Sequence, residues 1–403
     1  AYKLAPYFAR RLDSIKSMYY SEQSFDDFYY GKGSTFGDIH GSVGILFEQG
    51  SSRSLETTTS SGKLTYAYSV RNQFMATLGN IDGLVALRKD FLNYQKSFYQ
   101  TANSEAKKNP VKGYLISLKN NRTKAQMLLR NLQSHRIKAY ELKRTISIRE
   151  GKFNKGEAVI IPTKQPQTRF INGIMEKVTM FTDSLFYDVS AWTLPLAYGV
   201  ESYQLKQGPD SYLGNELPLV ELDGGSVMGG KAQSAYLMKW NRYYNARALY
   251  KILDAGVLPR LTTEPFSANV NGKKMSFDRG TIVIPVSQRD ANSTLTEDDI
   301  HNLMNDIALE NHVNIYATNS ASTPTGPDLG GAFQGLLKKP KVAILSGRGT
   351  SSYGVGEVWH LLNHRMHIPA SLVDANNLTQ RKLSHYNTLI LADGNYTMLS
   401  VEL

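Results

Sequence analysis

Residues 113–165 and 235–288 repeat one pattern, and this duplication restricts the possible folds more than anything else in the sequence. Each copy reads as a strand, a helix, a second strand, a turn containing lysine and glycine, and an apolar strand that ends in proline. At an offset of about 122 residues, the matching pairs are Tyr114 and Tyr236, Leu132 and Leu253, Pro162 and Pro285, and Gln165 and Gln288. We therefore predict two α/β units of common origin.

A helical run follows each copy, at 168–178 and at 297–309, and Thr296 or Thr294 can cap the second helix. Between the copies lie an aromatic run, residues 183–199, and a glycine-rich loop, residues 223–231. The loop lacks the Gly-Lys-Ser/Thr ending of a phosphate-binding loop, which argues against a nucleotide site. We interpret the aromatic run as core or as an interface between the units.

The last region, from residue 338, alternates strands and helices as a parallel sheet does. Strands are predicted at 342–345, 370–373 and 388–391, with a helix that ends near residue 367. This pattern resembles the beginning of a flavodoxin-like or glutamine-amidotransferase-like domain. The chain has no cysteine, so a cysteine nucleophile is excluded. The Gly/Ser loop 346–354, with Arg348, could hold an anion on its backbone N–H groups, although most such turns bind nothing.

The first region contains the clearest chemical signal, an apolar run from Val43 to Phe47 that ends at Glu48. Such a run predicts a buried strand. Ligand sites in open α/β sheets lie beyond the carboxyl ends of the strands, so Glu48 is a candidate general base. The structural alternative is a strand-end carboxylate that forms an ion pair with Arg53.

Helical spacing is predicted for residues 6–20 and for a long amphipathic run, residues 65–102. We interpret the apolar stripe of the long run as core; its members include Val70, Phe74, Ile81 and Val85. The polar stretch 103–112 reads as a linker to the duplicated region.

The stretch 28–53 resembles the C-terminal part of the catalytic domain of zinc carboxypeptidases, especially the large bacterial members. In that family an apolar strand ends in a catalytic glutamate, which Glu48 matches. A mobile, substrate-contacting tyrosine precedes it, and Tyr30, followed by glycines, Ser34 and Asp38, matches that arrangement, with Tyr29 as the neighbouring alternative. The candidate site residues are therefore Glu48 as the catalytic carboxylate, with Tyr30, Tyr29 and Arg53 as substrate-binding residues.

The sequence departs from the family in its metal ligands. The family holds zinc with a His-x-x-Glu pair and a later histidine, all before the catalytic glutamate, whereas only His40 precedes Glu48 here. We expect this chain to be a fragment that begins inside a carboxypeptidase domain, or else a degenerate, metal-free relative. The resemblance implies zinc and a peptide or protein substrate for the parent protein, with secretion or a periplasmic location. This chain alone is expected to hold no zinc and to be inactive. The alternative function is a non-enzymatic binding or scaffolding protein.

A second histidine pattern offers a weak alternative metal site. His360 and His364 are four residues apart and would share one face of the predicted helix. Leu361 stands where zinc proteases of the His-Glu-x-x-His type have their glutamate. The structural alternative is that these histidines favour the carboxyl end of the helix dipole.

Composition limits the remaining classes. The formal charge is +11, but the basic residues are scattered and form no nucleic-acid-binding motif, so we expect no nucleic-acid partner. No run of about 18 uncharged apolar residues is present, so we expect no membrane span. The oligomeric state stays open.

The predicted fold class is α/β. Residues 1–108 would form the C-terminal part of a carboxypeptidase-like sheet domain. Residues 109–337 would form the accessory region with the duplicated α/β units, and residues 338–403 would begin a flavodoxin-like parallel sheet.

Overall fold

The computed structural model describes residues 1–21, 30–177, 193–287, 294–378 and 383–397 of the 403-residue chain. The fold is mixed α/β, with several separate sheets. The chain divides into two compact units. Unit 1 contains residues 1–120 and 125–220, and unit 2 contains residues 121–124 and 221–403.

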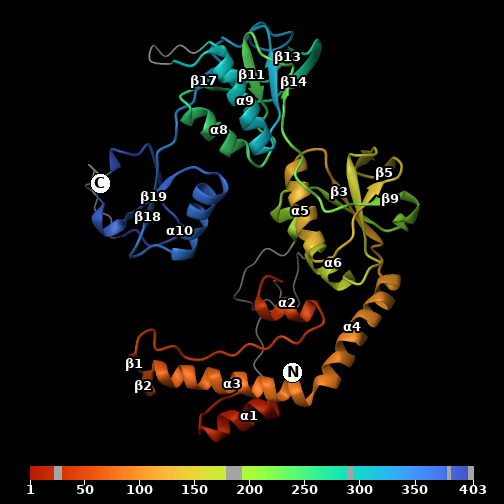
Figure 1. Cartoon of the computed structure of the whole chain (residues 1–403), viewed down its shortest axis with the longest axis vertical. Coiled ribbons are helices and arrows are strands. Elements are labelled where there is room, and N and C mark those ends of the chain that lie inside the picture. The colour runs from red at the N-terminus through yellow and green to blue at the C-terminus, as the bar shows by residue number, and fades with distance from the viewer. Residues whose placement is uncertain (22–29, 178–192, 288–293, 379–382, 398–403) are drawn as a thin grey trace. The chain divides into compact units, whose positions relative to one another are not determined.

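Unit 1 begins with helices rather than with a sheet (Figure 1). These elements are α1 (Ala5–Ser14), α2 (Gly33–Ile39), the hairpin β1 (Glu56–Thr59) and β2 (Gly62–Thr65), α3 (Tyr66–Ala86) and α4 (Arg88–Lys108). The long amphipathic run is therefore two helices that meet at Leu87, and α4 continues into the stretch predicted as linker. The predicted first helix ends earlier than expected, because Lys16 adopts a left-handed conformation with φ of 57°.

Glycines on α3 allow α1 to pack closely against it. A Cβ atom at Gly79 would lie 3.0 Å from the Cα atom of Phe8, and one at Gly83 would lie 2.5 Å from Leu4 Cδ2. Arg11 Nε adds an ion pair to Asp82 Oδ2 at 2.6 Å. Larger residues at these two positions would push the helices apart.

Two predictions for this region are wrong in this chain. Val43–Phe47 is not a strand, because no strand among the described residues lies beside it to take up its backbone hydrogen bonds. The stripe on α3 is not core. Four of its members remain 47 to 74% exposed, because no sheet among the described residues covers them; they are Val70, Phe74, Ile81 and Val85.

The rest of unit 1 is an antiparallel sheet with the strand order β8-β3-β7-β4-β9. Its elements, in chain order, are β3 (Gly113–Ser117), α5 (Arg122–Ser134), β4 (Tyr140–Leu142), β5 (Ile146–Ile148), β6 (Gly151–Phe153), β7 (Ala158–Pro162), α6 (Thr168–Met175), α7 (Leu194–Ala197), β8 (Ser202–Leu205) and β9 (Leu213–Glu216). We call this sheet with its helices and hairpin the first repeat.

Alternation along the central strand explains the layers of the first repeat. Tyr114 and Ile116 of β3 face the side on which α5 and α6 pack, whereas Leu115 faces the side of the β5–β6 hairpin. All three are nearly inaccessible to solvent. A strand buried on both faces reads as a continuous apolar run, which is what the sequence shows here.

Unit 2 opens with the second repeat, whose sheet has the order β10-β16-β11-β15-β12-β17. Its elements are β10 (Val227–Met228), β11 (Ala235–Met238), α8 (Asn245–Asp254), β12 (Arg260–Thr262), β13 (Phe266–Val270), β14 (Lys273–Phe277), β15 (Ile282–Pro285), α9 (Glu297–Asn311), β16 (Ile315–Thr318) and β17 (Gln334–Leu336). Apart from the extra edge strand β10, the two sheets have the same order, as the sequence duplication predicts.

Both repeats share the split β-α-β arrangement of ferredoxin-like folds. In the first repeat β3 and β4 run in the same direction on either side of β7, and β8 returns antiparallel beside β3. In the second repeat β11, β12, β15 and β16 take the same places. The inserted hairpins were not predicted, although Asn271-Gly272, with φ of 49° and 72°, is a strong hairpin signal.

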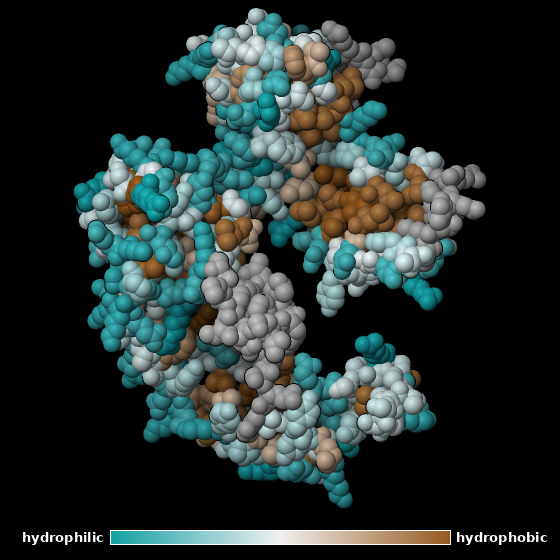
Figure 2. Space-filling view, turned by 180° about the vertical axis from the view of Figure 1, so that it is seen from behind, coloured by the Kyte–Doolittle hydropathy of each residue, from teal (hydrophilic) through white to brown (hydrophobic). Residues whose placement is uncertain are grey.

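The C-terminal region of unit 2 is a parallel sheet with the order β19-β18-β20, as predicted. It contains β18 (Val342–Ser346), α10 (Ser352–Trp359), the π-helical turn His360–Arg365, β19 (Ala370–Asp374) and β20 (Thr388–Ile390). Hydrophobic side chains gather on the face of this region that Figure 2 shows. None of the described helices is both long and apolar enough to cross a membrane.

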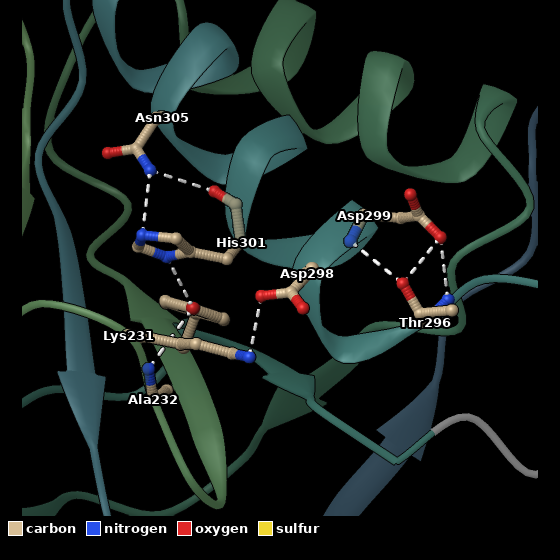
Figure 3. A network of polar contacts seen from close by, with 8 residues as sticks. Lys231, Ala232, Thr296, Asp298, Asp299, His301 and Asn305 are labelled. Carbon is tan, nitrogen blue, oxygen red and sulfur yellow. Dashed lines mark hydrogen bonds and ion pairs between the residues drawn. The ribbon is translucent and has the colours of Figure 1, made fainter.

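Thr296 caps α9, and the alternative Thr294 does not. The Thr296 hydroxyl accepts from the Asp299 N–H at 3.2 Å, and Asp299 Oδ2 accepts from the Thr296 N–H at 2.8 Å (Figure 3). Thr296→Ala should lower the free energy of unfolding of the second repeat by about 1 kcal/mol, because the Asp299 N–H loses its acceptor. Thr294→Ala is the control and should change it by less than about 0.5 kcal/mol in denaturant unfolding. Equal effects of the two changes would contradict the assignment of the cap.

Candidate functional site

The stretch that ends at Glu48 lies along α3 and α4 in unit 1. Near its start, Tyr99 of α4 donates to the His40 carbonyl oxygen at 3.1 Å. Further on, Gln73 of α3 donates to the Phe47 carbonyl oxygen at 3.3 Å, and Ser69 donates to that of Gly50 at 2.9 Å. Residues 41–50 thus run alongside two helices, from α4 to the first turn of α3. Ten residues can cover this path only with an extended backbone.

Side chains of this stretch alternate as they do in a strand. Val43, Ile45 and Phe47 line a groove of about 540 Å³ together with Leu4, which precedes α1, and with apolar residues of α3 and α4, among them Ala76, Leu84 and Phe91. Leu46 and Glu48 do not line the groove and are exposed. The stretch therefore has the side-chain period of a strand but not the hydrogen bonds.

The backbone of this stretch has few partners. From Val43 to Gly50 the described residues supply no backbone-to-backbone hydrogen bond. The Gly44 N–H donates to Asp38 Oδ1 at 2.6 Å, and the Phe47 and Gly50 carbonyl oxygens accept from side chains of α3. Asp38 thereby ties α2 to the beginning of the stretch.

Glu48 itself is exposed, and no described residue donates a hydrogen bond or an ion pair to its carboxylate. The structural alternative, an ion pair with Arg53, is not formed among these residues. Arg53 is exposed and left-handed, with φ of 56°, and its backbone N–H donates to Ser51 Oγ at 3.2 Å. A carboxylate without a structural partner is free to exchange protons with solvent or with a bound group.

Tyr30 does not lie beside Glu48. Its ring packs edge-on against Phe170 of α6, with centroids 5.2 Å apart, and against His135 at 6.1 Å. This places Tyr30 at the helix-side core of the first repeat. Tyr29, the alternative, lies outside the described residues.

The described residues do not fit a zinc ion. No group of three or more histidine, aspartate or glutamate side chains converges anywhere in the part of the chain that the structure describes. His360 and His364 do lie together, with parallel rings 5.4 Å apart, on a π-helical turn next to Trp359. A structural or catalytic zinc needs three or four protein ligands, so this pair alone is insufficient.

A polar network in the second repeat is a second candidate for the functional site, besides the Glu48 region (Figure 3). Tyr236 is fully buried, its hydroxyl oxygen accepts from the Ala232 N–H at 3.1 Å, and it lies 2.8 Å from His301 Nδ1. Burial raises the pKa of Tyr236. Asn305 Nδ2 lies 3.2 Å from His301 Nε2 and donates to the His301 carbonyl oxygen at 2.9 Å. Because an amide nitrogen can only donate, Nε2 is the acceptor, and Nδ1 of the neutral ring donates its proton to the Tyr236 hydroxyl oxygen. Every member has a partner, so this network anchors α9 to β11.

Comparisons with protein-family models, with curated proteins and with solved structures give no match for this chain. Its function therefore has to be argued from the geometry above and from the resemblance of residues 28–53.

The metal geometry generates a direct prediction. After dialysis against micromolar zinc, the purified chain should retain well below one zinc per chain by elemental analysis, because three ligands do not converge among its described residues. The His360→Ala/His364→Ala double variant should retain the same amount. One tightly bound zinc per chain that the double variant loses would contradict this account and would place the metal site in the C-terminal region.

Proposed function

We propose that residues 1–108 form the C-terminal part of a zinc-carboxypeptidase-like catalytic domain and that Glu48 is its general base. The observation that carries this proposal is the stretch that ends at Glu48. It has the alternation and the extended backbone of a strand, it is apolar on both sides, and it lacks only neighbouring strands.

The composition of the stretch favours burial on both faces. A strand with one wet face would carry polar residues at the positions that do not line the groove, yet Leu46 occupies one of these and is 48% exposed. The α3–α4 groove covers the other face. Strands from a preceding part of the parent protein would pair its free N–H and C=O groups and would complete a sheet.

The exposed apolar side chains on α3 support the same interpretation. Phe74 is 59% exposed and Val85 is 74% exposed, on a helix that also carries the groove. Contiguous apolar surface of this kind marks a face that another structural element covers. A sheet completed around residues 43–47 would shield the groove side, and further parts of the domain would shield the rest.

The described residues bring no three zinc ligands together. The resemblance implies that the ligands precede Glu48 in the parent protein and that zinc there supplies an activated water. The contribution of this chain would be a carboxylate at the end of a buried strand, free to accept and return a proton. Isolated, the chain is proposed to be inactive.

A non-enzymatic binding protein is the second candidate. It is favoured by the lack of a converging ligand group among the described residues and by the presence of two ferredoxin-like repeats in the same chain. In this case the free strand and the groove would serve to bind another chain. The two candidates differ in whether Glu48 is required for turnover in a longer protein.

The test is made in the longer protein that contains the proposed zinc ligands. Glu48→Gln should reduce hydrolysis of a peptide substrate by about two to four orders of magnitude, since a general base is lost, while zinc stoichiometry stays unchanged. Glu56→Gln is the matched control, because Glu56 is an exposed carboxylate on β1 that pairs with Lys63. Its turnover should equal that of the wild type. Full activity of the Glu48→Gln protein would contradict the proposal.

A further inference from the structure

Two histidines from distant parts of unit 1 meet in a cluster of aromatic rings. His40 follows α2, and His135 follows α5; their ring centroids lie 5.7 Å apart. Phe170 of α6 packs against both, at 4.8 Å from His40 and 4.7 Å from His135. Phe36 stacks on His40 at 4.4 Å, and Tyr30 completes the cluster. The cluster fastens residues 30–40 to the first repeat.

A hydrogen bond of the His40 ring fixes which of its two nitrogens carries the proton in the docked state. Nδ1 lies 2.8 Å from the Phe36 carbonyl oxygen, which can only accept, so Nδ1 carries the proton. Nε2 is then the unprotonated nitrogen. It is buried and has no hydrogen-bond partner in the part of the chain that the structure describes.

His135 is also held in its neutral form. Burial lowers its pKa from the usual 6.5, and the neighbouring His40 lowers it further. No described carboxylate forms an ion pair with His135 that would offset this lowering of its pKa. Asp38 accepts from the Gly44 N–H, Glu105 binds Arg169, and the other polar group that faces the pair is Tyr99, whose hydroxyl donates to the His40 carbonyl oxygen.

We propose that His40 and His135 form a pH-sensitive latch that holds residues 30–44 on the first repeat at neutral pH and releases them when His135 is protonated. The direction of the pH effect follows from the linkage between protonation of the imidazole and docking of residues 30–44. A base whose pKa is lower in the docked state keeps that state stable above the ordinary pKa. The docked state loses this stability as the pH falls from about 6.5 through the lowered value.

Release would affect more than α2. Tyr30 would leave Phe170, and the Asp38 contact to Gly44 would lose its support, so the stretch that ends at Glu48 would lose its fixed beginning. Regulation of a peptidase by this latch rests on the proposed function. The latch itself does not, because docking of α2 can be measured without any activity.

The experiment is hydrogen exchange of the full chain, followed for the amides of residues 33–44 and corrected for the intrinsic effect of pH. Protection in the wild type should fall by at least about tenfold from pH 7.5 to pH 5.0. This range ends above the usual carboxylate pKa of about 4, so Asp38 stays ionised. His135→Phe keeps an aromatic ring in the cluster and cannot be charged, so its protection should fall by less than about twofold.

Two further measurements keep the outcome decisive. His385→Phe, a change of an exposed histidine in the C-terminal region, should behave as the wild type does. An NMR titration of the wild type, which needs no folded variant, should show His135 titrating below the ordinary histidine value of about 6.5. Unchanged protection of residues 33–44 in the wild type, or an equal loss in His135→Phe, would overturn the latch.

Discussion

Backbone N–H and C=O groups that leave water need partners, and this requirement separates the two repeats from the stretch that ends at Glu48. In the repeats every central strand has a neighbour on each side, and the layers above and below exclude water. Val43–Gly50 has the apolar side chains of a central strand without neighbours. As a direct consequence, the stretch stays outside a sheet, and Leu46 and the apolar face of α3 stay exposed.

The duplicated region is complete by the same criterion. Tyr114 and Tyr236 occupy equivalent places on β3 and β11, and both are buried under helices. The first repeat also contacts the N-terminal helices. Arg169 of α6 binds Glu105 of α4 at 2.6 Å and lies over the Phe98 ring at 4.2 Å. This contact and the His40–His135 cluster connect the Glu48 region to a fully folded sheet.

Much of the fold could be predicted from the sequence where each signal was local. The duplication, the apolar strands that end in Pro162 and Pro285, the cap at Thr296 and the parallel C-terminal sheet all follow from short patterns. The split order of the repeat sheets could not be predicted, because sequence spacing does not tell which strand inserts between two others. Val43–Phe47 was predicted as a strand since its composition fits one; composition carries no information about whether a neighbouring strand is present.

The candidate site was predictable in part. Glu48 was found because a carboxylate ends an apolar run, and the ion pair with Arg53 that would have explained it structurally is not formed. The packing of Tyr30 on Phe170 was missed, as was the meeting of His40 with His135. These contacts join residues 140 and 95 positions apart, and a lone histidine in a sequence gives no sign of its partner.

The central claim is that Val43–Phe47, which is not a strand in this chain, becomes one when the parent protein supplies neighbouring strands. Hydrogen exchange of the amides of residues 43–48, compared between this chain and the longer protein that contains the proposed zinc ligands, tests it most directly. We predict exchange near the unprotected rate in this chain and strong protection in the longer protein, because neighbouring strands would bind these N–H groups. Equal exchange in both proteins would show that no sheet forms around Glu48 and would contradict the account.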